Sequence, residues 1–196
     1  MNLPNRLTVA RIAMVPLFAL AASLAVESPG KRLYLAAGLI FALASITDLL
    51  DGKIARSRNL VTNFGKFADP LADKILTTAA FLYMQAEGVC SPVVLLLILT
   101  REFAVAGLRM IAVSADSGAV IAANIWGKVK TVAQMTAVVA VIIIEMLGSL
   151  LSSLGIGFPH DIAFFVETLL LWTSAAATVV SGAVYAAKGK AFFADA

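Results

Sequence analysis

Residues 33–73 read LYLAAGLIFALASITDLLDGKIARSRNLVTNFGKFADPLAD, an apolar run that passes directly into a cluster of aspartates. The first part, Leu33–Leu50, carries a single charged side chain, Asp48, near its end. A helix that crosses a bilayer needs roughly 20 mostly apolar residues. The run therefore predicts a membrane-spanning helix with acidic groups at one membrane boundary.

The composition of the whole chain agrees with this reading. Of 196 residues, 61% are hydrophobic and 14% are charged, and the mean hydropathy is +0.94. Soluble domains carry about a quarter charged residues, so the water-soluble classes are excluded. The single cysteine, Cys90, excludes an internal disulfide and a cysteine-based metal cluster. The net charge of +3 is modest, and we expect no nucleic-acid partner.

Six apolar stretches predict an all-α, six-helix transmembrane bundle that forms one domain over residues 1–196. We expect the first stretch to remain as a span, because it contains Arg11 and lacks a small-residue cleavage site. The stretches are Leu7–Val26, Leu33–Leu50, Leu71–Ala86, Pro92–Val113, Lys130–Leu151 and Ile162–Ala187. Segments rich in breakers separate them, among them Asn59 to Pro70 and Gly155 to Pro159.

The basic residues predict the orientation. With six spans, one side of the membrane receives both termini and most of the basic residues, and the other side clearly receives only Lys31 and Arg32. The positive-inside rule then puts both termini in the cytoplasm of a multi-pass membrane protein. The basic residues of the first side are Arg6, Lys53, Arg56, Arg58, Lys66, Lys128, Lys188 and Lys190, with Lys74 and Arg109 at membrane ends.

The aspartates predict a metal site. Asp48 and Asp51 are three residues apart and Asp69 and Asp73 are four apart, so each pair shares one helix face. The short connection makes the two helices antiparallel neighbours that present four carboxylates to a common point. Such hard oxygen ligands suit Mg²⁺ or Mn²⁺, with Ca²⁺ as a non-catalytic occupant. Two metals about 4 Å apart would clamp a diphosphate.

Two glycines and an arginine accompany the aspartates. Gly52 and Gly65 lack side chains where a nucleotide needs close approach to the backbone, and Arg56 is a fork-shaped donor suited to phosphate oxygens. The spacing alone leaves two other readings open. The carboxylates are solvated caps of helix ends, or they form the cation site of a divalent-cation transporter.

The pattern Asp48-x-x-Asp51-Gly52-x-x-Ala55-Arg56-x₈-Gly65-x-x-x-Asp69-x-x-x-Asp73 resembles the signature of the CDP-alcohol phosphatidyltransferase family, with all eight fixed residues present. The resemblance implies a homodimer of six-span chains with a dinuclear Mg²⁺ or Mn²⁺ site at the cytoplasmic membrane surface. By position, it implies that Asp48, Asp51 and Asp69 hold one metal and that Asp48, Asp69 and Asp73 hold the second. It also implies that Asp73 is the general base and that Gly52, Arg56 and Thr62 contact the cytidine diphosphate.

The second half of the chain bears on the acceptor alcohol. Basic groups inside membrane sequence call for an anionic partner, and Arg101 and Arg109 lie within about 80° on one helix face. A phosphate-bearing acceptor such as glycerol 3-phosphate would satisfy them. Lys128 and Lys130 are about 200° apart on a helix, so both reach the substrate only if the helix starts between them. The alternatives are an internal ion pair of the Arg101–Glu102 region and a role for Lys128 as an ordinary membrane anchor.

Three further blocks sharpen the acceptor. Residues 2–11, 101–109 and 126–135 resemble the branch of this family that forms phosphatidylglycerophosphate. That resemblance implies CDP-diacylglycerol as donor and sn-glycerol 3-phosphate as acceptor. Inositol phosphate, serine and phosphatidylglycerol remain as alternative acceptors. Outside these blocks, Cys90, Glu145, His160 and Glu167 favour packing or solvent contact over catalysis.

Overall fold

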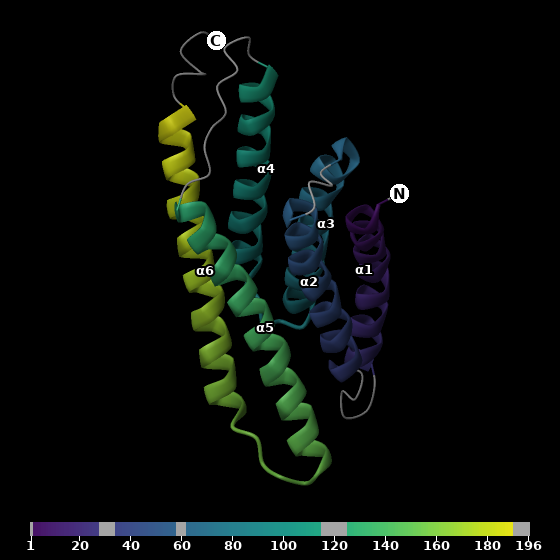
Figure 1. The fold of residues 1–196 in the computed structure, drawn as a ribbon. Coiled ribbons are helices and arrows are strands. Elements are labelled where there is room, and N and C mark those ends of the chain that lie inside the picture. The colour runs from purple at the N-terminus through teal and green to yellow at the C-terminus, as the bar shows by residue number, and fades with distance from the viewer. Residues whose placement is uncertain (1, 28–33, 58–61, 115–124, 190–196) are drawn as a thin grey trace.

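The computed structural model is a bundle of helices (Figure 1). It describes residues 2–27, 34–57, 62–114 and 125–189, and some side chains within the helices lie outside the described part. The six described helices overlap the six predicted apolar stretches, so the all-helical prediction is confirmed. They are α1 (Leu3–Glu27), α2 (Tyr34–Ser57), α3 (Asn63–Ala86), α4 (Pro92–Ser114), α5 (Ile125–Ser153) and α6 (His160–Gly189).

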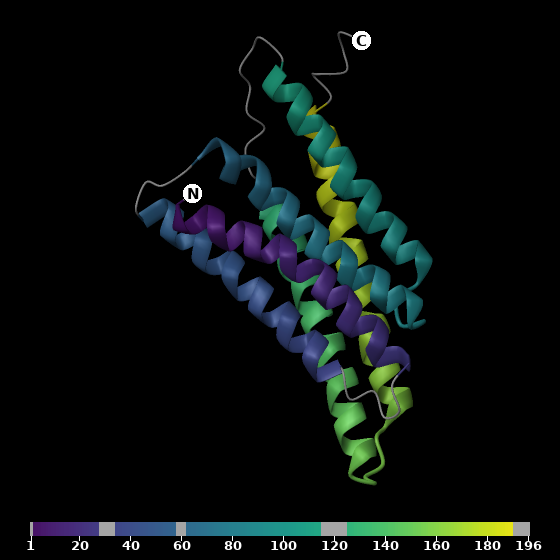
Figure 2. The same ribbon diagram turned by 90° about the vertical axis from the view of Figure 1, so that its right-hand side faces the viewer.

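The helices alternate in direction and form two packed groups. α1 packs against α2 and α3, whereas α6 packs against α4 and α5. Figures 1 and 2 show α1, α2 and α3 side by side, and α5 crosses from the second group toward them. The start of α1 and the end of α6 lie at the same end of the bundle (Figure 1). That end also holds the end of α2 and the start of α3.

Glycines in the left-handed region end two of the helices. Gly88 follows α3 with φ 78° and Gly155 follows α5 with φ 71°. After α5, the N–H of Ile156 donates to the carbonyl of Leu151 at 3.0 Å, and the N–H of Gly155 donates to that of Ser152 at 3.1 Å. This paired closure satisfies carbonyls that a helix end leaves without partners. The break predicted at Gly155 to Pro159 is therefore confirmed.

Aromatic rings and small side chains fill the core of the first group, α1 to α3. Phe18 of α1 contacts Phe41 of α2 with ring centroids 5.8 Å apart and Tyr83 of α3 at 6.3 Å. Ala22, Ala44 and Ala80 are fully buried and let the helix backbones approach each other. The core therefore joins the first three helices along their length.

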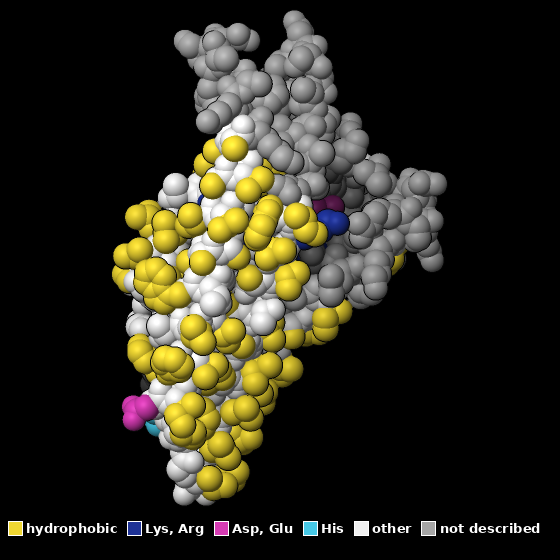
Figure 3. Space-filling view, turned by 90° about the vertical axis from the view of Figure 1, so that its left-hand side faces the viewer, with side chains coloured by type: hydrophobic (Ala, Val, Ile, Leu, Met, Phe, Trp, Pro, Cys, Tyr) yellow, Lys and Arg dark blue, Asp and Glu magenta, His cyan; other side chains and the backbone are white. Residues whose placement is uncertain are grey.

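Large hydrophobic side chains cover the outside of the bundle. Figure 3 shows one broad apolar face with few charged side chains in view. Among the described residues, three helices are long and apolar enough to cross a membrane, within Asn5–Ala25, Ile125–Ser153 and His160–Ala187. Lipid is the natural neighbour of such a surface. The membrane character is therefore supported, while six crossings and their orientation remain predictions.

Two helices begin earlier than the sequence predicts. The interval from Asn59 to Pro70 is predicted as a break, but α3 already begins at Asn63. Thr62 explains this start, because its side chain accepts a hydrogen bond from the N–H of Gly65 at 3.0 Å and so caps the helix. α5 begins at Ile125, before both Lys128 and Lys130. The condition under which both lysines would face one substrate is therefore not met.

Candidate active site

The signature residues lie on the neighbouring ends of α2 and α3. Because both segments are continuous helices, the spacings of three and four put each aspartate pair on one helix face, as predicted. Of the four aspartates, the described part of the structure includes the side chain of Asp69 alone. α2 carries Asp48, Asp51, Gly52 and Arg56, and α3 carries Gly65, Asp69 and Asp73.

The carboxylate of Asp69 is held by a hydrogen bond from α1. The hydroxyl of Thr8 donates to Oδ1 of Asp69 with an Oγ1–Oδ1 distance of 2.5 Å, across 61 residues of sequence. Thr8 is fully buried, and the two helices pack against each other here. The first helix thus reaches directly to one of the predicted metal ligands.

A second contact lies one helical turn earlier on α1. The hydroxyl of Thr62 donates to Oδ1 of Asn5 at 2.9 Å, and the same hydroxyl accepts from the N–H of Gly65. A hydroxyl has one donor, and here Asn5 receives it. The predicted contact of Thr62 with cytidine diphosphate therefore requires the hydroxyl either to accept a hydrogen bond or to leave Asn5.

Gly65 lies where three polar groups converge. A Cβ at this position would lie 3.3 Å from Oδ1 of Asn5, 3.4 Å from Oγ1 of Thr62 and 3.5 Å from Oδ2 of Asp69. The first distance is tighter than ordinary van der Waals contact, so a side chain at position 65 would require the Asn5 side chain of α1 to give way. The close approach of α1 is a reason for glycine that the sequence does not reveal.

A second polar cluster lies between α4, α5 and α6. Glu102 of α4 pairs with the ammonium of Lys130 from α5, and Nη1 of Arg101 lies 3.3 Å from the same carboxylate oxygen. These side chains are largely buried, with Lys130 6% exposed. The alternative of an internal ion pair in the Arg101–Glu102 region is therefore present in the structure.

The α6 helix shapes a socket for Arg101. Nη2 of Arg101 donates to the hydroxyl of Ser181 at 2.6 Å, and the guanidinium carbon lies 5.3 Å from the centre of the Tyr185 ring. The chain of Arg101 passes so close to Gly182 that a Cβ there would lie 3.1 Å from its Cγ. The face of the Tyr185 ring and the hydroxyl of Ser181 hold the guanidinium, and neither group neutralises its charge.

The structure separates the two lysines at the start of α5. Lys130 points into the bundle, whereas Lys128 is exposed. Arg109 lies on α4, and its side chain lies outside the described residues. Of the four residues predicted to bind the acceptor phosphate, the structure therefore brings together Arg101 and Lys130.

Comparison with known proteins agrees with the signature. The family model described as CDP-alcohol phosphatidyltransferase matches residues 1–180. The chain belongs to the CDP-alcohol phosphatidyltransferase family. The resemblance carried by the eight signature residues is thereby confirmed. The match includes α1 and most of α6, so it extends over all six described helices.

Curated relatives resemble this chain over most or nearly all of its length. A CDP-diacylglycerol–glycerol-3-phosphate 3-phosphatidyltransferase of Bacillus subtilis is 42% identical over 95% of this chain and 94% of its own length. A protein of the same name from Rickettsia bellii is 37% identical over 98% of this chain and 97% of its own length. A probable phosphatidylglycerophosphate synthase of Mycobacterium tuberculosis is 40% identical over 70% of this chain and 64% of its own length.

The residues of this phosphatidyltransferase fit a divalent metal. The family is generally dependent on divalent metal ions. Carboxylate oxygens on facing helices are the hard donors that Mg²⁺ and Mn²⁺ prefer, and the Asp69 carboxylate is already held by Thr8. No group of three possible ligands occurs among the described side chains, of which Asp69 is the one signature aspartate.

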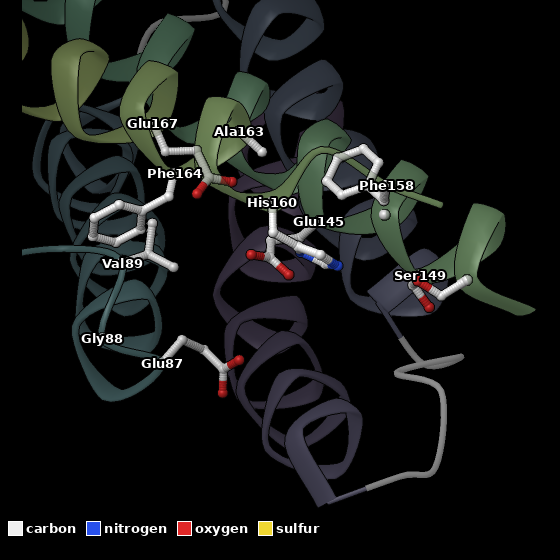
Figure 4. Close-up of a pocket in the computed structure, with 12 residues that line it drawn as sticks. Glu87, Gly88, Val89, Glu145, Ser149, Phe158, His160, Ala163, Phe164 and Glu167 are labelled. Atoms are coloured by element: carbon white, nitrogen blue, oxygen red, sulfur yellow. The ribbon is translucent and has the colours of Figure 1, made fainter. Parts of the chain in front are cut away.

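A cavity of about 400 Å³ lies at the opposite end of the bundle. Figure 4 shows the side chains of Glu145, His160 and Glu167 around this opening, with Glu87 entering from the end of α3. The ring of Phe158 packs edge-on against His160, with ring centroids 5.1 Å apart. The sequence does not predict this cavity, and it is separated from the signature by the length of α3.

Sequence reasoning missed the polar face of α1. Asn5, Thr8 and Arg11 are all buried, and they recur every three residues in an apolar helix. Buried polar groups at one helical spacing inside membrane sequence indicate a partner within the bundle. The regular spacing of Asn5, Thr8 and Arg11 is visible in the sequence, within the stretch 2–11 that is interpreted above only as the mark of one branch of the family.

Proposed function

We propose that this chain is an enzyme that transfers the phosphatidyl group of CDP-diacylglycerol to sn-glycerol 3-phosphate, giving phosphatidylglycerophosphate and CMP. The observation that carries the proposal is the identity of 42% and 37%, over nearly full length, with two proteins of that name. The complete signature on α2 and α3 supports the phosphatidyl-transfer chemistry. CDP-diacylglycerol, sn-glycerol 3-phosphate and the lipid bilayer are then its partners.

The four aspartates hold the metals in this proposal. Asp48, Asp51 and Asp69 would hold one divalent cation, Mg²⁺ or Mn²⁺, and Asp48, Asp69 and Asp73 would hold the second. A divalent metal held there would supply positive charge to the diphosphate and to the departing phosphate. Arg56 adds a fixed positive charge at the phosphate oxygens of the donor, and the open backbone at Gly52 leaves room for the nucleotide.

Asp73 acts as the general base. The acceptor hydroxyl attacks the β-phosphorus, which bears diacylglycerol, and a new phosphorus–oxygen bond forms as the bond to the CMP oxygen breaks. The proton of the hydroxyl passes to Asp73, and the electron pair of the broken bond leaves with CMP. A carboxylate is a weak base for an alcohol, so proton transfer accompanies a developed attack.

The acceptor phosphate binds near the cluster of α4 and α5. Arg101 and Lys130 are buried close together, and Arg109 belongs to the same predicted face of α4. A phosphate competes with the Glu102 carboxylate for these cations, since both are anions that accept charge-assisted hydrogen bonds. The exposure of Lys128 favours Lys130 over it as the lysine of this pocket.

The membrane placement is part of the proposal. Six helices cross the bacterial inner membrane with both termini in the cytoplasm, and the aspartates face the cytoplasmic surface. The excess of basic residues on the aspartate side supports this orientation. We also propose a homodimer, as the family resemblance implies.

Acceptor competition tests the proposed reaction. Purified protein is given radiolabelled CDP-diacylglycerol and an equimolar mixture of glycerol 3-phosphate, inositol phosphate, serine and phosphatidylglycerol. We expect the label to appear in phosphatidylglycerophosphate. Label in another product would assign a different acceptor within the family. Divalent-cation flux into vesicles without lipid turnover would instead support a transporter.

A further inference from the structure

The hydrogen bond from Thr8 to Asp69 differs from those of most helical threonines in this chain. Threonine in a helix commonly donates to a carbonyl of the preceding turn of its own helix. Thr47, Thr131 and Thr178 do so, with distances of 2.7, 3.0 and 2.7 Å. The hydroxyl of Thr8 instead reaches across to a carboxylate on α3.

The bond fixes the orientation of the carboxylate. Oδ1 of Asp69 accepts from Thr8, while Oδ2 lies on the side of Gly65, 3.5 Å from where a Cβ of that residue would stand. Two neighbours therefore set the plane of the Asp69 carboxylate: the Thr8 hydroxyl binds Oδ1, and Oδ2 lies beside Gly65, which has no side chain. An unanchored aspartate would rotate about its terminal torsion, which is broad.

The anchor itself is rigid. Thr8 is 0% exposed, and one turn earlier Asn5 accepts a second hydrogen bond from Thr62, the cap of α3. Two hydrogen bonds, Thr8 to Asp69 and Thr62 to Asn5, thus join the start of α1 to the start of α3. Thr8 cannot shift without disturbing the cap, so the position of its hydroxyl is defined by the packing of two helices.

We propose that Thr8 is a positioning residue of the metal site, which holds Asp69 in the orientation that divalent cations require. This inference rests on the proposed role of Asp69 as a ligand of both metals. Groups that hydrogen-bond to metal-ligating carboxylates orient them, and their loss typically lowers metal affinity or activity by about 10- to 100-fold. In this account α1 contributes to the active site without touching the substrate.

Binding of Mn²⁺ in the absence of substrates tests the inference. The free Mn²⁺ signal in electron paramagnetic resonance is followed during titration of the detergent-solubilised protein. Thr8→Val keeps the shape of the side chain and removes the hydroxyl, so we expect the dissociation constant to rise by about 10- to 100-fold. Thr8→Ser restores the hydroxyl and should stay close to wild type. If Thr8→Val does not fold, Thr8→Ala replaces it.

Thr178→Val is the matched control. Thr178 is also fully buried and accepts a hydrogen bond between helices, from Gln134 at 3.1 Å, but it lies on α6. We expect it to lose thermal stability with unchanged Mn²⁺ binding. With saturating Mn²⁺, turnover by Thr8→Val should recover toward the wild-type value, whereas general damage would lower it at every Mn²⁺ concentration.

Asp69→Asn separates this inference from the metal site as a whole. If Asp69→Asn loses Mn²⁺ binding while Thr8→Val binds as wild type does, the positioning role is wrong and the metal site stands. If Asp69→Asn itself binds Mn²⁺ like wild type, both the metal role of Asp69 and the positioning role of Thr8 are wrong.

Discussion

The aspartates of α2 and α3 and the glutamates around the cavity are two acidic regions at opposite ends of one bundle. The aspartates recur at helical spacing on two neighbouring helices, and Asp69 is anchored from a third. The glutamates come from the residue after α3, the last third of α5 and the first third of α6, with no common spacing. Among the described residues they form no group able to hold a metal. Regular spacing on two neighbouring helices, more than the number of acids, is therefore what supports the proposed metal site at the aspartates.

The largest expected effect is the loss of turnover when an aspartate of α2 or α3 is replaced, compared with replacement of a glutamate at the cavity. Replacing Asp48, Asp51, Asp69 or Asp73 by Asn should lower turnover by at least about 100- to 1,000-fold, because each removes stabilisation of transition-state charge. Expression should stay nearly intact, since neutralising one of several repelling acids relieves repulsion. Turnover is measured as CMP release from purified variants in detergent.

Glu87→Gln and Glu145→Gln are the matched controls at the cavity. Both remove one carboxylate from an acidic region and should leave turnover within a few-fold of wild type. Full activity in two of the four aspartate variants would contradict the dinuclear site. A loss of activity in the glutamate variants that equals the loss in the aspartate variants would erase the distinction between the two regions.

The α1 contacts show what the sequence could and could not predict. Six helices, the shared faces of the aspartate pairs and the terminating glycines follow from local patterns, because period and breaker residues act over a few positions. The bond between Thr8 and Asp69 joins residues 61 apart, and local spacing carries no information about it. Glycine at position 65 is likewise explained by a side chain from another helix.

The directions in which Lys128 and Lys130 point depend on where α5 begins, and the sequence predicts that start poorly. The predicted membrane stretch opens at Lys130, but the helix begins at Ile125. Each residue turns a helix by about 100°, so two lysines that are two residues apart inside the helix point in nearly opposite directions. Helix ends are hard to place from sequence to within a residue or two, and here the helix begins before both lysines.

The second prediction uses this separation. Lys130→Gln should raise the KM for glycerol 3-phosphate by roughly 10- to 150-fold, the equivalent of a charge-assisted contact of about 1.5–3 kcal/mol. Lys128→Gln, which alters an exposed neighbour, should change it little. The KM for CDP-diacylglycerol should barely move in either variant, since metal and Arg56 hold the donor.

Arg109→Gln joins this series as an independent probe of the pocket. It should also raise the glycerol 3-phosphate KM, and some loss of kcat should follow because the phosphate positions the attacking hydroxyl. Unchanged KM values in both Arg109→Gln and Lys130→Gln would remove the acceptor pocket. The metal site would be unaffected by that result.

The smallest expected effect is on the rate at which a thiol reagent labels Cys90, which lies between α3 and α4. Burial raises the pKa of Cys90 to about 11, so its reactive thiolate appears only as the pH rises toward that value. At pH 8 the native protein should label slowly with iodoacetamide, and rapidly after unfolding in detergent. Rapid labelling of the folded protein at pH 8 would contradict the burial of Cys90.

A Cys90→Ala background then permits a test of orientation. A cysteine introduced at position 59, between α2 and α3, should label from the cytoplasm and resist a membrane-impermeant reagent added to intact cells. Labelling from outside the cell would reverse the proposed topology and place the aspartates on the other membrane surface.

Metal reconstitution under single-turnover conditions tests the central claim most directly. Protein stripped with EDTA is mixed with CDP-diacylglycerol and glycerol 3-phosphate, and CMP release is followed as Mn²⁺ is added back. We predict no release before addition, recovery that saturates at two Mn²⁺ per chain, and no recovery in Asp69→Asn. Stripped protein that releases CMP at the wild-type rate, or Asp69→Asn that recovers fully, would contradict the aspartate metal site.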